Sequence, residues 1–292
     1  MPSHTRAIVR VFLLVLFSLI MLIFRLLFWP VAKVSPKTDR RYRRFLLKNW
    51  ARVYARIAGI RIVCEGQAPK PPFFLVMNHL SYFDMLVLAR ETGCVFVSRE
   101  DVADWPVFGF IAKSLYIIFI NRALKRDTVR VNSLIIKTIE EGDGIAIFPE
   151  GAVSCGMTVE AFKSPLLQSA IDLNIPVHYA ALSYHCADPM PVEGELVSWW
   201  RPIPFYVHQY RFLKHPGATA TIRFGEEALF DTDRKVLTRR LHEGVLALFT
   251  PLRMAAEVYA EDDFPVSTEE AEAPDCIAHG EALPESLSLD PR

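Results

Sequence analysis

An almost unbroken apolar stretch near the amino terminus, VFLLVLFSLIMLIFRLLFWPVA at residues 11–32, constrains this chain most. It is long enough to cross the hydrocarbon core of a bilayer as a helix, which takes about 20 residues. Only Arg6 and Arg10 precede it, whereas many Lys and Arg residues follow between positions 33 and 48. Because positive charge stays on the cytoplasmic side, we expect the rest of the chain to be cytoplasmic. A segment that enters one leaflet and returns, or a signal peptide, would be the alternatives.

The next segment, RRYRRFLLKNWARVYARIAG at residues 40–59, has the pattern of an amphipathic helix. Its apolar residues recur at helical spacing at Leu46, Trp50, Val53 and Ile57. Most of its arginines lie on the other side of that helix. A basic helix with an aromatic stripe, next to a membrane segment, predicts contact with an anionic membrane surface. An ordinary core helix with solvated charges is the alternative. We therefore expect residues 1–59 to form a membrane-anchoring helical segment.

From residue 60 to about 260, short apolar runs alternate with helical stretches. The runs are IRIVC, FFLVM, CVFVS, LYIIFI, IAIF, VHYAALSY and TATIRFG. Most lack polar alternation, which is typical of strands buried on both faces. The pattern predicts one α/β domain over residues 60–260, with a mostly buried mixed sheet covered by helices. Residues 261–292 are acidic and short of large apolar residues, which predicts a disordered tail.

Charge and cysteine usage exclude several classes of function. The 33 Lys and Arg residues balance the 33 Asp and Glu residues, so no net basic character suggests a nucleic-acid partner. The five cysteines form no CxxC pair, and no two histidines have the spacing of metal ligands. We therefore expect neither a metal nor another cofactor.

The residues that could carry chemistry begin at NHLSYFD, residues 78–84, directly after an apolar run. Positions five apart differ by about 140° in direction on one helix. His79 and Asp84 can therefore meet only if His79 precedes a helix and Asp84 points back from its first turns. Asn78 and Ser81 could cap that turn. A carboxylate on one ring nitrogen would make the histidine a general base, whereas a satisfied histidine in a capped turn is the alternative reading.

Further polar residues follow other predicted strands. The run IIFINR ends at Arg122, and IAIFPEG ends in Glu150 and Gly151. Pro149 stops strand pairing there, and Gly151 allows the next turn. A proline also stands at the entrance of the strand in NIPVHYAAL. Because ligand sites in α/β sheets gather at strand ends, we expect these residues to share one site with the histidine and aspartate.

Together and in this order, NHLSYFD, FINR, FPEG and IPVHYAAL resemble the four sequence blocks of the lysophospholipid and glycerolipid acyltransferase family, over about residues 70–185. The resemblance implies a membrane-bound O-acyltransferase that moves a fatty acyl chain from acyl-CoA or acyl carrier protein to the free hydroxyl of a lysolipid. It implies His79 as the catalytic base and Asp84 as its partner. The substrate-binding residues that it implies are Asn78, Ser81, Arg99, Arg122, Glu150, Gly151 and Lys163.

The sequence departs from the family pattern at two places. Asn121 stands where the family often has Asp, and Ala152-Val153-Ser154 replaces Thr-Arg-Ser after FPEG. The second departure removes an arginine and resembles a branch with EGTTSDG, some members of which acylate lyso-ornithine lipid. The family's commonest acceptor, 1-acyl-sn-glycerol-3-phosphate, which yields phosphatidic acid, is expected narrowly ahead of lyso-ornithine lipid.

Two readings from other classes of protein are set against this one. A non-catalytic membrane protein that binds lipid and retains the fold would not need the complete set of polar residues. A His/Asp esterase would carry a GxSxG elbow, which is absent. The resemblance also implies a place in a membrane, the bacterial inner membrane, with the catalytic domain on the cytoplasmic side.

Overall fold

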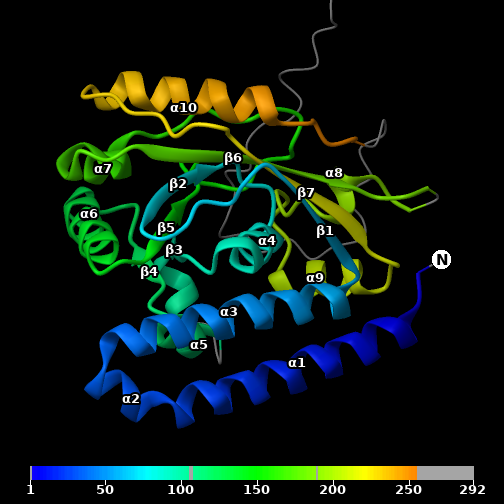
Figure 1. The fold of residues 1–292 in the computed structure, drawn as a ribbon. Helices are drawn as coiled ribbons and strands as arrows, with labels where there is room; N and C mark the ends of the chain where they lie inside the picture. Colours follow the sequence, from blue (N-terminus) through cyan, green and yellow to red (C-terminus); the bar gives the residue numbers. More distant parts are fainter. Residues whose placement is uncertain (1, 105–107, 189, 255–292) are drawn as a thin grey trace, which may run out of the picture.

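The computed structural model describes residues 2–104, 108–188 and 190–254, and at its centre is a sheet with the strand order β1-β7-β6-β2-β5-β3-β4 (Figure 1). The strands are β1 (Ile60–Glu65), β2 (Phe73–Met77), β3 (Val95–Arg99), β4 (Ile118–Ile120), β5 (Gly144–Ile147), β6 (Val177–His185) and β7 (Ala218–Phe224). Neighbouring strands are parallel, except that β6 and β7 are antiparallel. The predicted mixed sheet is confirmed, while the predicted tail lies outside the described residues.

The helices match the expected alternation, with differences at their ends. They are α1 (His4–Leu27), α2 (Trp29–Val34), α3 (Pro36–Ala58), α4 (Phe83–Thr92), α5 (Phe108–Ser114), α6 (Lys125–Glu140), α7 (Gln168–Leu173), α8 (Glu193–Leu196), α9 (Phe205–Leu213) and α10 (Arg234–Leu248). The sequence pattern predicts a helix over 233–258, but α10 ends at Leu248, shortly before Pro251, which disfavours helical backbone at the residue before it. Helices α8 and α9 were not expected from the sequence.

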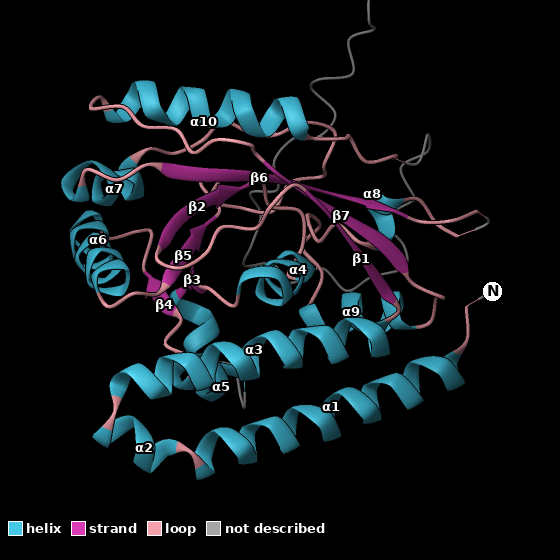
Figure 2. Cartoon of the chain, viewed as in Figure 1, coloured by secondary structure: helices cyan, strands magenta, loops and turns pink. Residues whose placement is uncertain are grey.

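Helices cover both faces of the sheet (Figure 2). On one face, α6, α7 and α10 pack on a cluster that includes Phe74 and Val76 of β2 and Ile145 of β5. On the other face, α3, α4 and α9 pack on a cluster that includes Leu75 and Met77 of β2. Every residue of β2 and β5 is buried, as a strand covered on both faces requires. The ends of these two strands are therefore held firmly in place.

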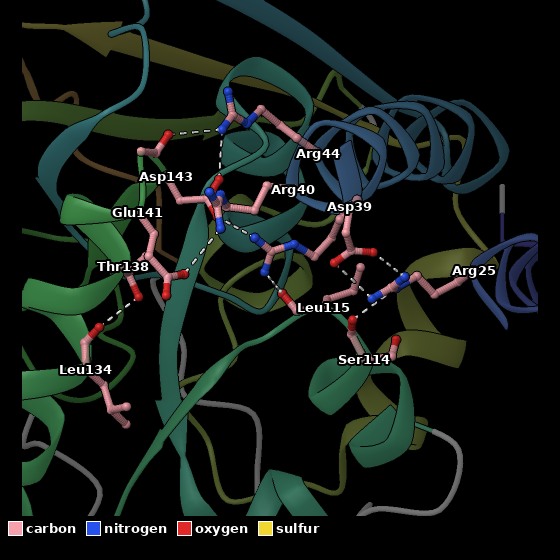
Figure 3. Close-up of polar contacts among 12 residues, drawn as sticks. Arg25, Asp39, Arg40, Arg44, Ser114, Leu115, Leu134, Thr138, Glu141 and Asp143 are labelled. Atoms are coloured by element: carbon pink, nitrogen blue, oxygen red, sulfur yellow. Dashed lines mark hydrogen bonds and ion pairs between the residues drawn. The ribbon is translucent and has the colours of Figure 1, made fainter. Parts of the chain in front are cut away.

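Helices α1 and α3 run antiparallel and side by side, with α3 next to the body of the protein (Figure 1). Leu47, Ala51 and Tyr54 of α3 belong to the core cluster of the sheet. Arg43 and Arg44 turn toward this body and pair with Asp143, between α6 and β5 (Figure 3 shows Arg44 and Asp143). The core-helix alternative for residues 40–59 thus describes α3 well, although its arginines are partly buried in ion pairs and not all solvated.

Polar contacts tie α1 to the rest of the chain at both of its ends. Near its start, Arg10 donates to the carbonyl oxygens of residues 213, 215 and 216, at the end of α9 and just after it. Near its other end, the buried Arg25 pairs with Asp39 at 2.8 Å and donates to the carbonyl of Ser114 at 3.1 Å (Figure 3). Among the described residues, α1 is the one helix long and apolar enough to cross a membrane.

Candidate active site

The loop of residues 78–82 joins β2 to α4. At its start, the side chain of Asn78 continues the hydrogen bonding between β2 and β6. The amide of Leu182 donates to Oδ1 of Asn78 at 2.7 Å, and Nδ2 of Asn78 donates to the carbonyl of Leu182 at 2.9 Å. The preceding residue, Met77, is paired with Ala180 in the β2–β6 ladder. The Asn78 side chain therefore imitates one more backbone pair and fixes where the loop begins.

His79 and Asp84 meet in the one arrangement that their spacing allows, with Nδ1 of the imidazole 2.7 Å from Oδ2 of the carboxylate. Asp84 lies in the first turn of α4 and is fully buried. The same oxygen accepts hydrogen bonds from the amides of Leu80 at 2.6 Å and Ser81 at 2.9 Å. The expected caps are wrong: the N-cap residue of α4 is Tyr82, and no side chain caps the helix there. Asp84 accepts instead from the amides of the loop before the helix.

The geometry selects one tautomer of the histidine. A carboxylate only accepts, so Nδ1 of His79 carries a proton and donates it to Asp84, which leaves the lone pair on Nε2. The ring of Phe148 stacks on the imidazole with centroids 4.2 Å apart and planes 19° apart. The side chain of His79 is 18% exposed, and Nε2 forms no hydrogen bond with the described residues. A basic nitrogen is thus oriented and open to a ligand.

Glu150 holds the backbone of the same loop and is itself buried. Its carboxylate accepts from the amide of His79 at 2.5 Å and from the amide of Glu160 at 3.0 Å. Burial raises the pKa of Glu150 to about 8, although both amide donors favour the charged form. The carbonyl of His79 accepts from the amide of Ser154 at 2.9 Å. The histidine is therefore held by its backbone as well as by its ring.

Several residues that hold this loop were not foreseen. Ser198 Oγ and the amide of Trp199 lie 3.0 and 2.9 Å from the carbonyl oxygen of Leu80. The hydroxyl of Tyr184 donates to Oδ1 of Asp84 at 2.8 Å. These residues are 100 or more positions from the loop along the chain, and no local pattern marks them.

The predicted cations lie at the neighbouring strand ends. Arg122, just after β4, donates from Nη1 to the carbonyl of Gly151, which follows β5. Gly151 has a φ of 82°, and a Cβ there would lie 2.9 Å from Nζ of Lys163. Burial, together with the nearby charge of Arg99, lowers the pKa of Arg122. Arg99, Arg122, Gly151 and Lys163 therefore surround one region at the carboxyl edge of the sheet.

The other predicted substrate-binding residues are deeply buried. Asn78 is 1% exposed, Ser81 is fully buried and Glu150 is 5% exposed. The polar atoms of Asn78 and Glu150 are engaged by backbone groups of the protein, as described above. In this structure these two side chains hold the loop, and the exposed polar groups of the site are His79 and the cations.

The oriented imidazole of His79 and the cations Arg99, Arg122 and Lys163 thus lie at the ends of strands in one sheet. The model of the family described as Acyltransferase matches residues 60–183. The lyso-ornithine lipid O-acyltransferase of Brucella abortus is 30% identical over 242 residues, which are 78% of this chain and 91% of that protein. The 1-acyl-sn-glycerol-3-phosphate acyltransferase of Neisseria gonorrhoeae is 32% identical over 44% of this chain and 52% of its own length.

A solved structure shares the fold. The crystal structure of the 1-acyl-sn-glycerophosphate acyltransferase PlsC from Thermotoga maritima aligns with a TM-score of 0.56 over 83% of this chain and 97% of that chain. Its sequence identity is 18%, so this similarity is evidence for the fold alone. The chain belongs to the lysophospholipid acyltransferase family.

Proposed function

We propose that the protein transfers a fatty acyl chain from an acyl thioester, carried by coenzyme A or acyl carrier protein, to the hydroxyl of a lysolipid in a bacterial inner membrane. The observation that carries this proposal is the open Nε2 of His79, with Nδ1 held 2.7 Å from a fully buried carboxylate. Such a nitrogen accepts a hydroxyl proton, and the carboxylate stabilises the imidazolium that results.

In the proposed reaction, Nε2 of His79 removes the proton from the acceptor hydroxyl as its oxygen attacks the thioester carbonyl. The tetrahedral intermediate then collapses, the carbon–sulfur bond breaks and the new ester forms. The leaving thiolate takes the proton back from the imidazolium, which restores the histidine. The acyl donor is already activated, so no covalent enzyme intermediate is needed.

We propose lyso-ornithine lipid as the preferred acceptor. The Brucella relative that matches along most of its length acts on this lipid by its name. An ornithine head group is a zwitterion with one carboxylate and one ammonium, and a single arginine and a lysine can bind the carboxylate. Arg122 and Lys163, on either side of Gly151, supply these groups, whereas the half-buried Val153 supplies no donor.

A second candidate acceptor is 1-acyl-sn-glycerol-3-phosphate, which the sequence placed narrowly first. It is favoured by the additional charge of Arg99, which lies close enough to Arg122 to act on its pKa. Three cations would suit a phosphomonoester, whose charge is greater than that of a carboxylate. Arg99 also donates to Asp101 at 2.9 Å, however, which offsets part of its charge. This ion pair is our reason for placing the phosphate second.

Direct competition tests the acceptor. With both lysolipids in one reaction and the products scored by mass, we expect the wild type to favour lyso-ornithine lipid. Val153→Arg should shift the preference toward the phosphate, because arginine adds a bidentate donor. Arg122→Ala should raise the apparent KM of the preferred acceptor by roughly 10- to 100-fold, as expected from losing a hydrogen bond to a charged group.

The control is Arg239→Ala, which removes an exposed arginine of α10 whose ion-pair partner is Glu243. It should leave both KM values unchanged. A wild-type preference for the phosphate acceptor would show that lyso-ornithine lipid is wrong. The absence of transfer to either lipid, from acyl-CoA and from acyl carrier protein, would reject the proposed activity itself.

We further propose that α1 lies within one leaflet instead of crossing the bilayer. Its outer face exposes large apolar side chains, with Phe12 64%, Ile23 56% and Leu27 73% exposed. Contacts at both ends bind it to the predicted catalytic domain, from Arg10 to the carbonyl of His215 and from Arg25 to the carbonyl of Ser114. A perpendicular span would place one of these ends on the far side of the membrane and break its contacts. The apolar face therefore fits an in-plane position.

Cysteine labelling distinguishes the two arrangements. In spheroplasts that express a His4→Cys variant, an impermeant maleimide should label position 4 only after the inner membrane is permeabilised. The natural exposed thiol of Cys64, in β1, reports the cytoplasmic side in the same molecules. Labelling of position 4 in intact spheroplasts, while Cys64 stays unlabelled, would establish a full span.

A further inference from the structure

Asp84 has a second oxygen that the histidine does not use. Oδ2 accepts three hydrogen bonds, from Nδ1 of His79 and from two backbone amides of the loop. Oδ1 points the other way and accepts one, from the hydroxyl of Tyr184 at 2.8 Å. Asp84 has no exposed surface, and Tyr184 is 5% exposed. This oxygen has no other hydrogen-bond donor among the described residues.

We infer that Tyr184 is a positioning residue of the acyl transfer, which orients Asp84 and moderates the pull of its charge on the proton of His79. The inference rests on the proposed function, because it assigns a task within that reaction. Tyr184 does not touch the reacting atoms; it acts through the carboxylate.

The charge of Asp84 makes this contact important. Among the described residues, no Lys or Arg forms an ion pair with this buried carboxylate. The titratable groups that face it are His79 from the loop before α4, Glu150 from the end of β5 and Tyr184 from β6. Glu150 is itself acidic and supplies no positive charge. Hydrogen bonds from uncharged donors must therefore stabilise the negative charge of Asp84.

Tyr184 suits the task because its hydroxyl keeps its proton. Burial, with the neighbouring charge of Asp84, raises the pKa of Tyr184 well above its usual range. The group therefore donates to Oδ1 throughout the pH range in which the enzyme could work. A phenol that ionised would repel the carboxylate and lose the hydrogen bond.

The position of Tyr184 is set by the sheet and not by the loop. In β6 it is paired with Ala220 of the antiparallel β7. Two residues earlier in the same strand, the backbone of Leu182 is clasped by the side chain of Asn78. Strand β6 therefore fixes both the start of the loop of residues 78–82 and the position of Oδ1 of Asp84.

The test is Tyr184→Phe in the full-length protein, which removes the hydroxyl and retains the ring. We expect kcat to fall roughly 10-fold, as for loss of one hydrogen bond to a charged group, with KM for the lysolipid within about two-fold of wild type. Without the donor, the carboxylate attracts the imidazole proton more strongly. The acidic limb of the pH–rate profile should then move to higher pH.

The matched control is Tyr179→Phe. Tyr179 belongs to the same strand, but it packs with the cluster on the opposite face of the sheet, away from Asp84. This variant should keep the kcat and the pH profile of the wild type. A loss of kcat in Tyr184→Phe without a shift of the acidic limb would overturn the inference, because a packing defect would explain it. Unchanged kinetics would overturn it as well.

A spectroscopic readout separates this inference from the proposed function. The ring of His79 can be followed by NMR in protein labelled at histidine, with its signal identified by its absence in His79→Ala. The midpoint of its titration should move to higher pH in Tyr184→Phe and stay in place in Tyr179→Phe. This holds even if the wild type acylates none of the lysolipids tested, which would reject the activity alone. An unmoved midpoint would reject the role of Tyr184.

Discussion

Replacing His79 by alanine is expected to lower kcat by 10²- to 10⁴-fold, the usual contribution of a general base. The variant should fold normally. The amide and carbonyl of residue 79 keep their partners, Glu150 and Ser154, whatever the side chain is. The ring itself contacts mainly Asp84 and Phe148.

The measurement is transfer of a labelled acyl chain to a lysolipid by purified protein in detergent, with the melting temperature recorded beside it. His178→Ala is the control, because this histidine lies in β6 against Phe73 and outside the loop. It should retain wild-type turnover. Near-normal turnover by His79→Ala would falsify the proposed mechanism, because another group would then have to act as the base.

Asp84→Asn is expected to be about as damaging, with kcat reduced by roughly 10³- to 10⁴-fold. An asparagine oxygen in place of Oδ2 can still accept from the amides of Leu80 and Ser81, so the loop should stay in place. The amide has no negative charge, however, and cannot stabilise an imidazolium.

The comparison with Asp84→Ala sharpens this prediction. Alanine leaves two buried amides without an acceptor, and each such loss typically costs about 1–3 kcal/mol. Thermal unfolding should therefore separate the two variants, with the asparagine variant close to wild type and the alanine variant clearly less stable. If both variants are less stable than the wild type to the same degree and both are inactive, Asp84 serves the fold, and its charge is not what the reaction needs.

Local sequence patterns were enough to predict the buried strands and the placement of the residues at their ends. The run FFLVM has no polar residue, and β2 is buried on both faces as expected. The five-residue spacing of His79 and Asp84 was enough to place one before α4 and the other in its first turn. The strand ends that carry Arg122 and Gly151 come together because the strands between them are parallel neighbours.

Contacts between distant segments could not be predicted in this way. Tyr184 reads as an ordinary strand residue, and only the pairing of β6 with its neighbours brings it to Asp84. Ser198 lies in a stretch without helical or strand periodicity, yet it reaches the loop through its hydroxyl. Arg43 reads as part of a basic surface, because nothing near it in the sequence reveals that Asp143 will supply its counter-charge.

The packing of α3 bears on how the enzyme can be handled and shortened. A truncation that begins at β1 looks attractive, since it removes the most apolar part of the chain. It would also strip α3 from α4 and the sheet, and uncover the apolar surface now shared with Leu47, Ala51 and Tyr54. An exposed apolar face of that kind promotes aggregation. We expect residues 60–254 to be insoluble when produced alone, and the water-soluble form of this enzyme to require detergent around an intact helix pair.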